Sequence, residues 1–303
     1  MPMPSPFPNF FRSLSRSWKG ERRALILQRL EQADAETVRL KQALASGQRQ
    51  AEEAQVHAKR LEEELRLVRT ELASRPEALP PDHLQVRQVA AVWGPAFFTE
   101  GRVIFDQVAE AFRTAGLPLN RAAAVLDFGC GCGRVLWSFQ HNAHDGEIWG
   151  CDVDAEAIAW NRAHLGNIAQ FCCNQPLPPT RFPDGFFDAI YAISVFTHLP
   201  EEIQFAWLAE LRRLLRPGGI FLASLHGSHY WTADPGVKAE VESRGFAYRT
   251  GIPTPGLPDY YMVAFHSEAY LRSRWSRFVD FVAIREKYIH SLHDAVIMRR
   301  RDD

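Results

Sequence analysis

The sequence is poor in cysteine, and the few cysteines do not form a disulfide framework. Five cysteines occur in 303 residues, and all of them lie between positions 130 and 173. Disulfide-stabilised secreted domains instead spread an even number of cysteines along a short chain. A reducing compartment is therefore expected. We also expect no metal site, because no Cys or His pair is spaced to complete a tetrahedral set with Cys130 and Cys132.

Long apolar runs and an excess of charge are missing as well. No run of roughly 18 apolar residues is present, and the N-terminus lacks an apolar segment followed by a small-residue cleavage site. Lys and Arg number 35 against 36 Asp and Glu, so the formal net charge is -1 and the overall field attracts no nucleic acid. Basic residues gather in the N-terminal arm and at 298–301, without the interleaved aromatics of a base-stacking platform. These absences predict a cytoplasmic protein that binds no nucleic acid.

Residues 1–23 form a basic, aromatic arm with four prolines by position 8. Its apolar residues fall at helical spacing between basic ones: Phe7, Phe11, Leu14 and Trp18. This pattern is typical of a helix on an anionic membrane surface, and it allows peripheral membrane contact through residues 7–19. A loosely ordered arm that packs on the body or on a partner chain is the interpretation we prefer, and a targeting peptide is a third.

Residues 24–75 carry a heptad repeat. Eleven of its thirteen seam positions are apolar, and no proline interrupts the chain between Pro8 and Pro76. Six heptads of this kind predict a long helix that pairs as a coiled coil, and hence a homo-oligomer. A single solvated helix folded back on the body is the alternative. The proline-rich residues 76–83 read as a linker, which leaves residues 84–303 as one domain.

From residue 84 onward, strand patterns alternate with helix patterns. Strands are predicted near 124–127, 147–153, 169–173, 187–193, 220–225, 278–284 and 293–298, with helices at 84–115, after 133, at 156–165 and at 200–215. Strands separated by helices predict an α/β fold, a doubly wound and mostly parallel seven-stranded sheet. The last two strands follow each other closely, and one of them is expected to run antiparallel to the rest.

The stretch VLDFGCGCGRVLW places Gly129, Gly131 and Gly133 directly behind the first strand. Glycines at the first strand-to-helix turn of a doubly wound sheet let the backbone approach a ligand closely. The dinucleotide fingerprint does not fit, because Arg134 occupies the place of its third glycine, and a phosphate-binding P-loop is absent. Some other ligand must sit against this turn.

The segment DFGCGCG resembles the first motif of class I methyltransferases, which use S-adenosylmethionine. Further similar segments follow in order: GCDVD, CCNQPLP, DGFFDAIYAISVFTHL and LRRLLRPGGIFLAS. The resemblance implies a Rossmann-like methyltransferase fold and S-adenosylmethionine as cofactor. Carried over position by position, it implies a cofactor site made of Asp127, Gly129, Cys130, Gly131, Gly133, Asp152, Val153, Asn174 and Ser194.

Within that site the resemblance gives three residues particular roles. Asp152, with Asp154 as a near competitor, would accept hydrogen bonds from the ribose hydroxyls. Asn174 would bond the adenine amino group through its amide oxygen, although the family has Asp more often at this position. Asp127 would lie near the methionine amino group, or would only brace the loop.

Histidines are the candidate proton acceptors for methyl transfer to a hydroxyl group. His198 follows the fourth strand, and His226 and His229 follow the fifth. An imidazole can take a proton near neutral pH, so His198 is the first candidate base. The alternative for His198 is a capping or packing role. His226 and His229 are the rival candidates.

Residues 226–275 read as an insertion whose Pro, Gly and aromatic content suits a lid better than regular structure. Its GLPDYY and FHSEAYL segments, with DAVIMRR at the C-terminus, resemble methyltransferases associated with bacterial glycan synthesis. That resemblance implies a glycan or other small-molecule acceptor, most simply a sugar hydroxyl. Two other interpretations stay open: a methyltransferase for another small molecule or a protein side chain, and a scaffold that binds cofactor without turnover.

Overall fold

The computed structural model describes residues 79–89, 94, 96–142, 144–251 and 253–302. The predicted arm at 1–23, the coiled-coil helix at 24–75 and residues 76–78 of the linker lie outside the described residues. The described residues all belong to the unit Pro76–Asp303. Within them, no helix is long and apolar enough to cross a membrane.

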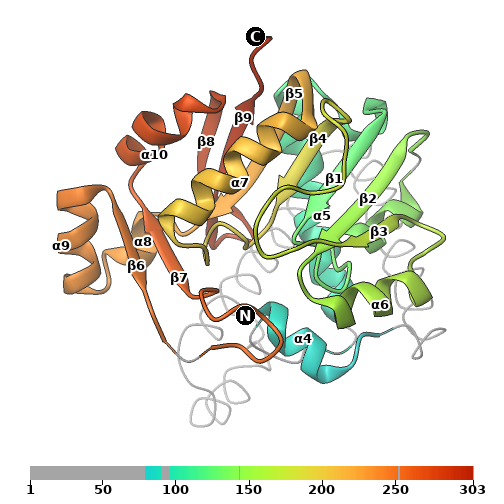
Figure 1. Ribbon diagram of the computed structural model, residues 1–303, viewed down its shortest axis with the longest axis horizontal. Helices are drawn as coiled ribbons and strands as arrows, with labels where there is room; N and C mark the ends of the chain where they lie inside the picture. Colours follow the sequence, from blue (N-terminus) through green and yellow to red (C-terminus); the bar gives the residue numbers. More distant parts are fainter. Residues whose placement is uncertain (1–78, 90–93, 95, 143, 252, 303) are drawn as a thin grey trace, which may run out of the picture. The chain divides into compact units, whose positions relative to one another are not determined.

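A seven-stranded sheet in the order β3-β2-β1-β4-β5-β9-β8 forms the centre of this unit (Figure 1). Its strands are β1 (Ala124–Phe128), β2 (Glu147–Asp152), β3 (Gln170–Cys173), β4 (Phe187–Ala192), β5 (Leu215–Leu225), β8 (Asp280–Ile289) and β9 (His293–Arg299). Strands β1 to β5 are parallel, and β9 lies antiparallel between β5 and β8. The predicted mostly parallel sheet is confirmed, including the reversed strand near the C-terminus.

Helices cover both faces of the sheet. Successive residues of each strand point to opposite faces and therefore pack against different helices. On β1, Val125 packs in the cluster that includes α5 (Ala96–Thr114) and α6 (Ala155–His164), whereas Leu126 packs in the cluster that includes α7 (Glu201–Leu214) and α10 (Glu268–Arg274). In Figure 1, α7 crosses in front of the strands and α5 lies behind them. The central strands are buried on both sides, as a doubly wound sheet requires.

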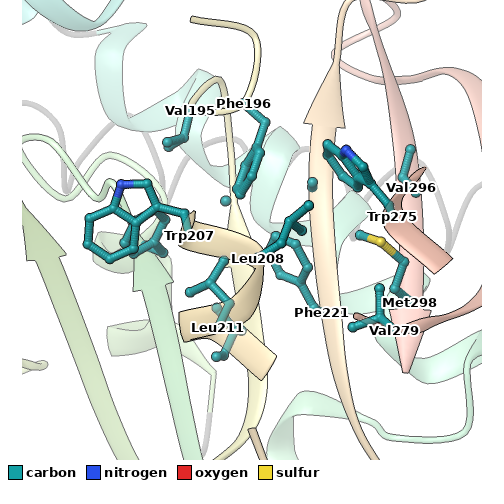
Figure 2. Packing of buried hydrophobic residues seen from close by; sticks show 14 of the residues in the cluster. Val195, Phe196, Trp207, Leu208, Leu211, Phe221, Trp275, Val279, Val296 and Met298 are labelled. Atoms are coloured by element: carbon teal, nitrogen blue, oxygen red, sulfur yellow. The ribbon is translucent and has the colours of Figure 1, made fainter. Parts of the chain in front are cut away.

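The core under α7 is built mainly from large side chains. Figure 2 shows Trp207, Leu208 and Leu211 of α7 beside Phe196 and Phe221, all of them buried. Trp275, which is fully buried, extends this cluster toward Met298 of β9. The cluster fixes the end of β4, which leads directly into the segment that carries His198.

Two sequence expectations about local structure were wrong. The segment after the glycines is a short 3₁₀-helix, η4 (Leu136–His141), and not an α-helix. The tighter turn aligns residues three apart, so that Leu136 and Phe139 are both buried on one side. Phe139 meets Phe105 of α5 edge-on at 4.9 Å between ring centroids. Packing against α5 therefore favours this geometry.

The insertion at 226–275 also contains more regular structure than expected. It holds α8 (Ser228–Trp231), α9 (Pro235–Arg244), the hairpin partners β6 (Phe246–Arg249) and β7 (Val263–His266), and α10. Asp234 caps α9 and Gly245 ends it in the left-handed region. The remaining elements are α4 (Asp82–Val89), η3 (Leu119–Arg121) and η5 (Trp275–Arg277). Between β6 and β7, residues 250–251 and 253–262 keep the loop character predicted for a lid.

Gly101 of α5 provides a test of how closely α5 approaches the glycine-rich turn. A Cβ at this position would lie 2.0 Å from the carbonyl oxygen of Arg134. Gly101→Ala should therefore lower the free energy of unfolding by roughly 1–3 kcal/mol, despite the better helix propensity of alanine. Chemical denaturation measures this change. Gly251→Ala, where nothing lies within 4 Å of the added Cβ, is the control and should be nearly neutral. A Gly101→Ala protein as stable as the parent would contradict the described packing.

Candidate functional site

A cavity lies at the carboxyl ends of β1, β2 and β4; we call it the first cavity. Its empty space amounts to about 970 Å³ when the space open to solvent is included. All of the predicted cofactor residues except Gly133 line it: Asp127, Gly129, Cys130, Gly131, Asp152, Val153, Asn174 and Ser194. The structure thus brings together residues that span 67 positions between Asp127 and Ser194.

The glycine-rich turn follows β1 and bends over the end of β2. The backbone N–H groups of Gly129 and Cys130 both donate to the carbonyl oxygen of Cys151, at 2.8 and 3.0 Å. Gly133 lies behind the cavity wall, where an added Cβ would meet Leu165 at 2.4 Å. This third glycine allows close packing against the end of α6 and is not part of the cavity lining.

Asp152 holds the turn and faces the first cavity. Its carboxylate accepts hydrogen bonds from the backbone N–H groups of Gly131, at 2.7 Å, and Asp154, at 2.8 Å. Burial raises the pKa of Asp152, and these two donors oppose that effect. A carboxylate has about four lone-pair positions, so acceptor capacity remains for a ligand.

Asp154, the competitor for this role, is used structurally. Its side chain caps α6 by accepting from the backbone N–H groups of Glu156 and Ala157. It also pairs with Arg87 of α4 at 2.9 Å. Asp154 lines the first cavity too, but one of its oxygens caps α6 and the other is held by the Arg87 ion pair. Asp152 accepts from backbone N–H groups and is therefore the better acceptor for a ligand.

Two further polar side chains lie in the first cavity. Asn174 donates through Nδ2 to the carbonyl of Gln175, while its Oδ1 is buried and has no hydrogen-bond partner among the described residues. Burial raises the pKa of the Asp127 carboxyl to about 8, against the opposing influence of Tyr191 and Arg134. A buried acceptor without a partner and a desolvated carboxyl are both groups that a polar, partly cationic ligand can satisfy.

The loop between β6 and β7 closes one side of the first cavity. Leu257, Pro258 and Tyr260 line the cavity together with Arg87. The hydroxyl of Tyr260 donates to the carbonyl of Pro176 at 2.8 Å, which ties the loop to the segment after β3. This is the position expected for the predicted lid.

A second cavity adjoins the first. It shares Arg87, Arg134, Ile193, Ser194 and Tyr261 with it. The second cavity is otherwise lined mainly by residues from the insertion and from the β8–β9 turn, and it includes four histidines: His198, His226, His290 and His293. The two cavities therefore meet at a common wall.

Ser194 lies at the junction of the two cavities in an unusual backbone conformation. Its φ is 59°, in the left-handed region that residues other than glycine rarely adopt. Its N–H donates to Ser224 Oγ at 2.8 Å, and its carbonyl accepts from the Tyr261 hydroxyl at 2.8 Å. Strain of this kind persists where surrounding contacts enforce it, and it is frequent at functional sites.

His198 and His226 are fixed in the same tautomer. His198 donates through Nδ1 to the carbonyl of Met262, and His226 donates through Nδ1 to the carbonyl of Ala264 at 3.0 Å. Because a carbonyl oxygen only accepts, each ring carries its proton on Nδ1 and leaves Nε2 with a lone pair. Burial lowers the pKa of His198 and lowers that of His226 to about 4, so both rings are neutral at pH 7. Each is thus poised to accept a proton.

The third sequence candidate, His229, lies elsewhere. It belongs to α8 and lines neither cavity. Sequence reasoning missed His293, whose Nδ1 lies 3.4 Å from the hydroxyl oxygens of both Ser194 and Ser224. Only the antiparallel pairing of β9 with β5 brings His293 here, so no local pattern could have identified it. Among the described residues, no group of three or more His, Cys, Asp or Glu could hold a metal ion.

Comparison with known proteins agrees with this geometry. Residues 125–219 match the family model of a methyltransferase domain. Residues 125–219 thus form a methyltransferase domain, and S-adenosylmethionine is its cofactor. The match includes β1 to β4 and every predicted cofactor residue. It ends before His226, Arg249, Tyr261 and His293, so it leaves most of the second cavity uncovered.

Several curated proteins are similar to this methyltransferase domain. A probable methyltransferase, ltbC, of Aspergillus luteorubrus is 29% identical over 113 residues, which are 34% of this chain and 39% of that protein. The sterol 24-C-methyltransferase erg6 of Aspergillus fumigatus is 29% identical over 144 residues, which are 43% of this chain and 36% of that protein. The chain thus spans well under half the length of these relatives.

Solved structures similar to this chain include two S-adenosylmethionine-dependent methyltransferases. A SAM-dependent methyltransferase of Methanosarcina mazei has a TM-score of 0.46 and 16% identity, and the match covers 59% of this chain and 93% of that one. A methyltransferase of Mesorhizobium loti has a TM-score of 0.45 and 17% identity, covering 65% and 100%.

The tautomers of the buried histidines can be measured directly. Nitrogen-15 NMR of the imidazole rings at pH 7 should show His198 and His226 protonated on Nδ1 only. His266 is the internal control: its Nε2 faces Gln204 Oε1 at 2.9 Å, while Gln204 Nε2 donates to the carbonyls of Phe196 and Leu199. It should therefore show the opposite tautomer. Protonation of His198 or His226 on Nε2 at this pH would contradict the assigned geometry.

Proposed function

We propose that this protein transfers a methyl group from S-adenosylmethionine to a hydroxyl group of a polar small molecule or glycan. The observation that carries the proposal is the junction at Ser194 and Tyr261. There, a cavity lined by the cofactor motifs opens onto one that holds two neutral histidines with free Nε2 lone pairs.

The residues of the first cavity fit S-adenosylmethionine in their chemistry. Asp152 would accept from the ribose hydroxyls, and the partnerless Oδ1 of Asn174 would accept from the adenine amino group. Asp127 offers a carboxyl group and Arg134 a guanidinium group to the zwitterionic amino-acid end of the cofactor. Gly129, Cys130, Gly131 and Val153 leave room for the ligand beside the backbone.

S-adenosylmethionine supplies an electrophilic methyl carbon bonded to a sulfonium sulfur. Residues of this chain must align an acceptor oxygen with that carbon, exclude water and remove the hydroxyl proton. His198 or His226 takes the proton on Nε2 as the oxygen–carbon bond forms and the bonding electrons of the sulfur–carbon bond stay on sulfur. Tyr261 stacks on His198 at 4.4 Å between ring centroids and holds the imidazole in place.

The lining of the second cavity favours a polar acceptor. It combines apolar side chains with Arg, His, Ser and Thr side chains, and these polar groups would have no partners on a sterol, the acceptor named for several relatives. The resemblance of GLPDYY, FHSEAYL and DAVIMRR to glycan-associated methyltransferases supports a sugar hydroxyl.

As part of the same proposal, residues 24–75 pair as a coiled coil in a homo-oligomer, and residues 7–19 are available for membrane contact.

Turnover with isotope-labelled S-adenosylmethionine tests this proposal. The full-length protein is incubated with labelled donor and, in separate reactions, hydroxyl-rich oligosaccharides, a sterol and an unrelated protein. We expect label in the oligosaccharide fraction. Label in the sterol or in the protein would replace the acceptor class, and binding of S-adenosylmethionine without transfer to any acceptor would favour the scaffold interpretation.

Asp152→Asn should weaken the binding of S-adenosylhomocysteine roughly tenfold to a hundredfold. The substitution removes the negative charge that would bind the ribose hydroxyls, and hydrogen bonds to charged groups contribute about 1.5–3 kcal/mol. It also turns an amide N–H₂ toward one of the two backbone N–H donors, so that one hydrogen bond is lost. Calorimetric titration gives the affinity. Glu147→Gln, at the exposed start of the same strand, is the control and should leave binding unchanged. Equal affinity in Asp152→Asn and the parent would remove Asp152 from the cofactor site.

The turnover rate should fall on the acid side only at low pH. A general base works in its neutral form, and burial lowers the pKa of His198 below the ordinary 6.5 and that of His226 to about 4. Activity should therefore persist at pH 6 and fall only as the pH drops toward the lowered value. Measurement of kcat against pH, with S-adenosylmethionine and an accepted oligosaccharide both saturating, checks this expectation in the complex. An acid limb centred above 6.5 would contradict it.

Substitution by asparagine separates the two histidines. The Asn side-chain N–H₂ can replace Nδ1 as donor to Met262 or Ala264, but it offers no base in place of Nε2. The variant that loses kcat by about 10²–10⁴-fold identifies the base, and the other should keep most of the activity. Full activity in both variants would exclude a histidine base.

A further inference from the structure

The charged residues are unequally divided between the two cavities. The first cavity is lined by three acids, Asp127, Asp152 and Asp154, besides two arginines. The second cavity is lined by Arg87, Arg134 and Arg249, and none of the described residues that line it is Asp or Glu. The polar groups on its wall are otherwise histidines and hydroxyls.

Arg249 is the arginine that belongs to the second cavity alone. It lies on β6, and its Nη1 pairs with Glu240 Oε2 of α9 at 2.6 Å. Glu240 lines neither cavity. The Arg249 side chain is 39% exposed, and a guanidinium has five N–H donors, so donors beyond those used by this pair are available to a ligand.

Arg87 and Arg134 lie at the junction. Arg87 pairs through Nη1 with Asp154 and Glu156, each at 2.9 Å, and neither acid lines the second cavity. Burial lowers the pKa of Arg134 to about 10, which still leaves it charged at pH 7. The wall therefore carries fixed positive charge next to neutral histidines.

Hydroxyl groups complete a site for an anion. Ser194, Thr250 and Thr254 line the same cavity as Arg249. Guanidinium and hydroxyl donors together bind phosphate and carboxylate oxygens, and arginine matches both in a two-pronged arrangement. A neutral sugar would use these donors less well, because hydrogen bonds to an ionised acceptor are roughly twice as strong as those to a neutral one.

We propose that the acceptor carries an anionic group, a phosphate ester or a carboxylate, held in the second cavity by Arg249 with Arg134 and the Thr250 and Thr254 hydroxyls. The inference rests on the proposed function, because it assigns the substrate class of that same acceptor site. An anionic acceptor also complements the positive charge of the sulfonium donor.

Matched sugars test the charge requirement. Glucose, glucose 6-phosphate and glucuronic acid are titrated at constant ionic strength into the full-length protein saturated with S-adenosylhomocysteine, and NMR of His198 and His226 reports binding. At least one anionic sugar should bind roughly tenfold tighter than glucose. Preference for the phosphate alone assigns a phosphate ester, and preference for glucuronic acid, alone or equally, assigns a carboxylate. No preference for either over glucose would overturn the inference.

Two variants each break the Arg249–Glu240 ion pair, but they are expected to affect anion binding differently. Arg249→Gln should weaken binding of the preferred anionic sugar about tenfold and leave glucose unaffected. Glu240→Gln removes the competing carboxylate, so it should leave anion binding intact or tighten it severalfold. Similar losses in both variants would indicate a structural effect of the ion pair, and an unchanged affinity in Arg249→Gln would place the anion elsewhere; either result would overturn the assignment.

Failure of the inference is distinguishable from failure of the proposed function. The titration begins with S-adenosylhomocysteine alone. Lack of binding at that step would contradict the cofactor site, whereas tight binding followed by equal affinity for glucose and its anionic relatives would contradict only the anionic acceptor.

Discussion

The candidate site depends on one short backbone pairing between the segment after β4 and the start of β7. Met262 N–H donates to the carbonyl of His198 at 3.0 Å, and Ala264 N–H donates to that of Thr197 at 2.7 Å. The carbonyls of Met262 and Ala264 in turn accept from the Nδ1 groups of His198 and His226. Without this pairing neither imidazole would have a fixed tautomer, and Tyr261 would not reach the carbonyl of Ser194. The insertion therefore positions catalytic candidates as well as covering the cavities.

The two cavities differ in their charged residues because their walls come from different parts of the chain. Acids at the ends of β1 and β2 face the first cavity, while none of the described residues that the insertion and the β8–β9 turn contribute to the second cavity is Asp or Glu. Because interactions between charges strengthen when water is excluded, such a division discriminates between ligands more sharply in a closed cavity than at an open surface. The proposed anionic acceptor would meet the wall that lacks acids.

The sequence predicted the first cavity well and the second poorly, for a physical reason. Asp127, the glycines and Asp152 lie at the ends of consecutive parallel strands, so chain order alone places them at one edge of the sheet. His293 and Arg249 reach the second cavity only through the antiparallel register of β9 and the β6–β7 hairpin, which depend on long-range pairing. The 3₁₀-helix after the glycines was missed because packing against α5 decides it, and Gly133 was assigned to the lining although it serves packing against Leu165.

We infer that the reacting end of the cofactor lies at the junction of the two cavities. A crystal structure of the protein with S-adenosylhomocysteine, with the ligand sulfur located by anomalous diffraction, would show where that end lies. The sulfur should lie beside Ser194 and Tyr261 and face the cavity that holds His198 and His226. A sulfur directed away from that cavity, with the adenine in its place, would exclude methyl transfer at this junction.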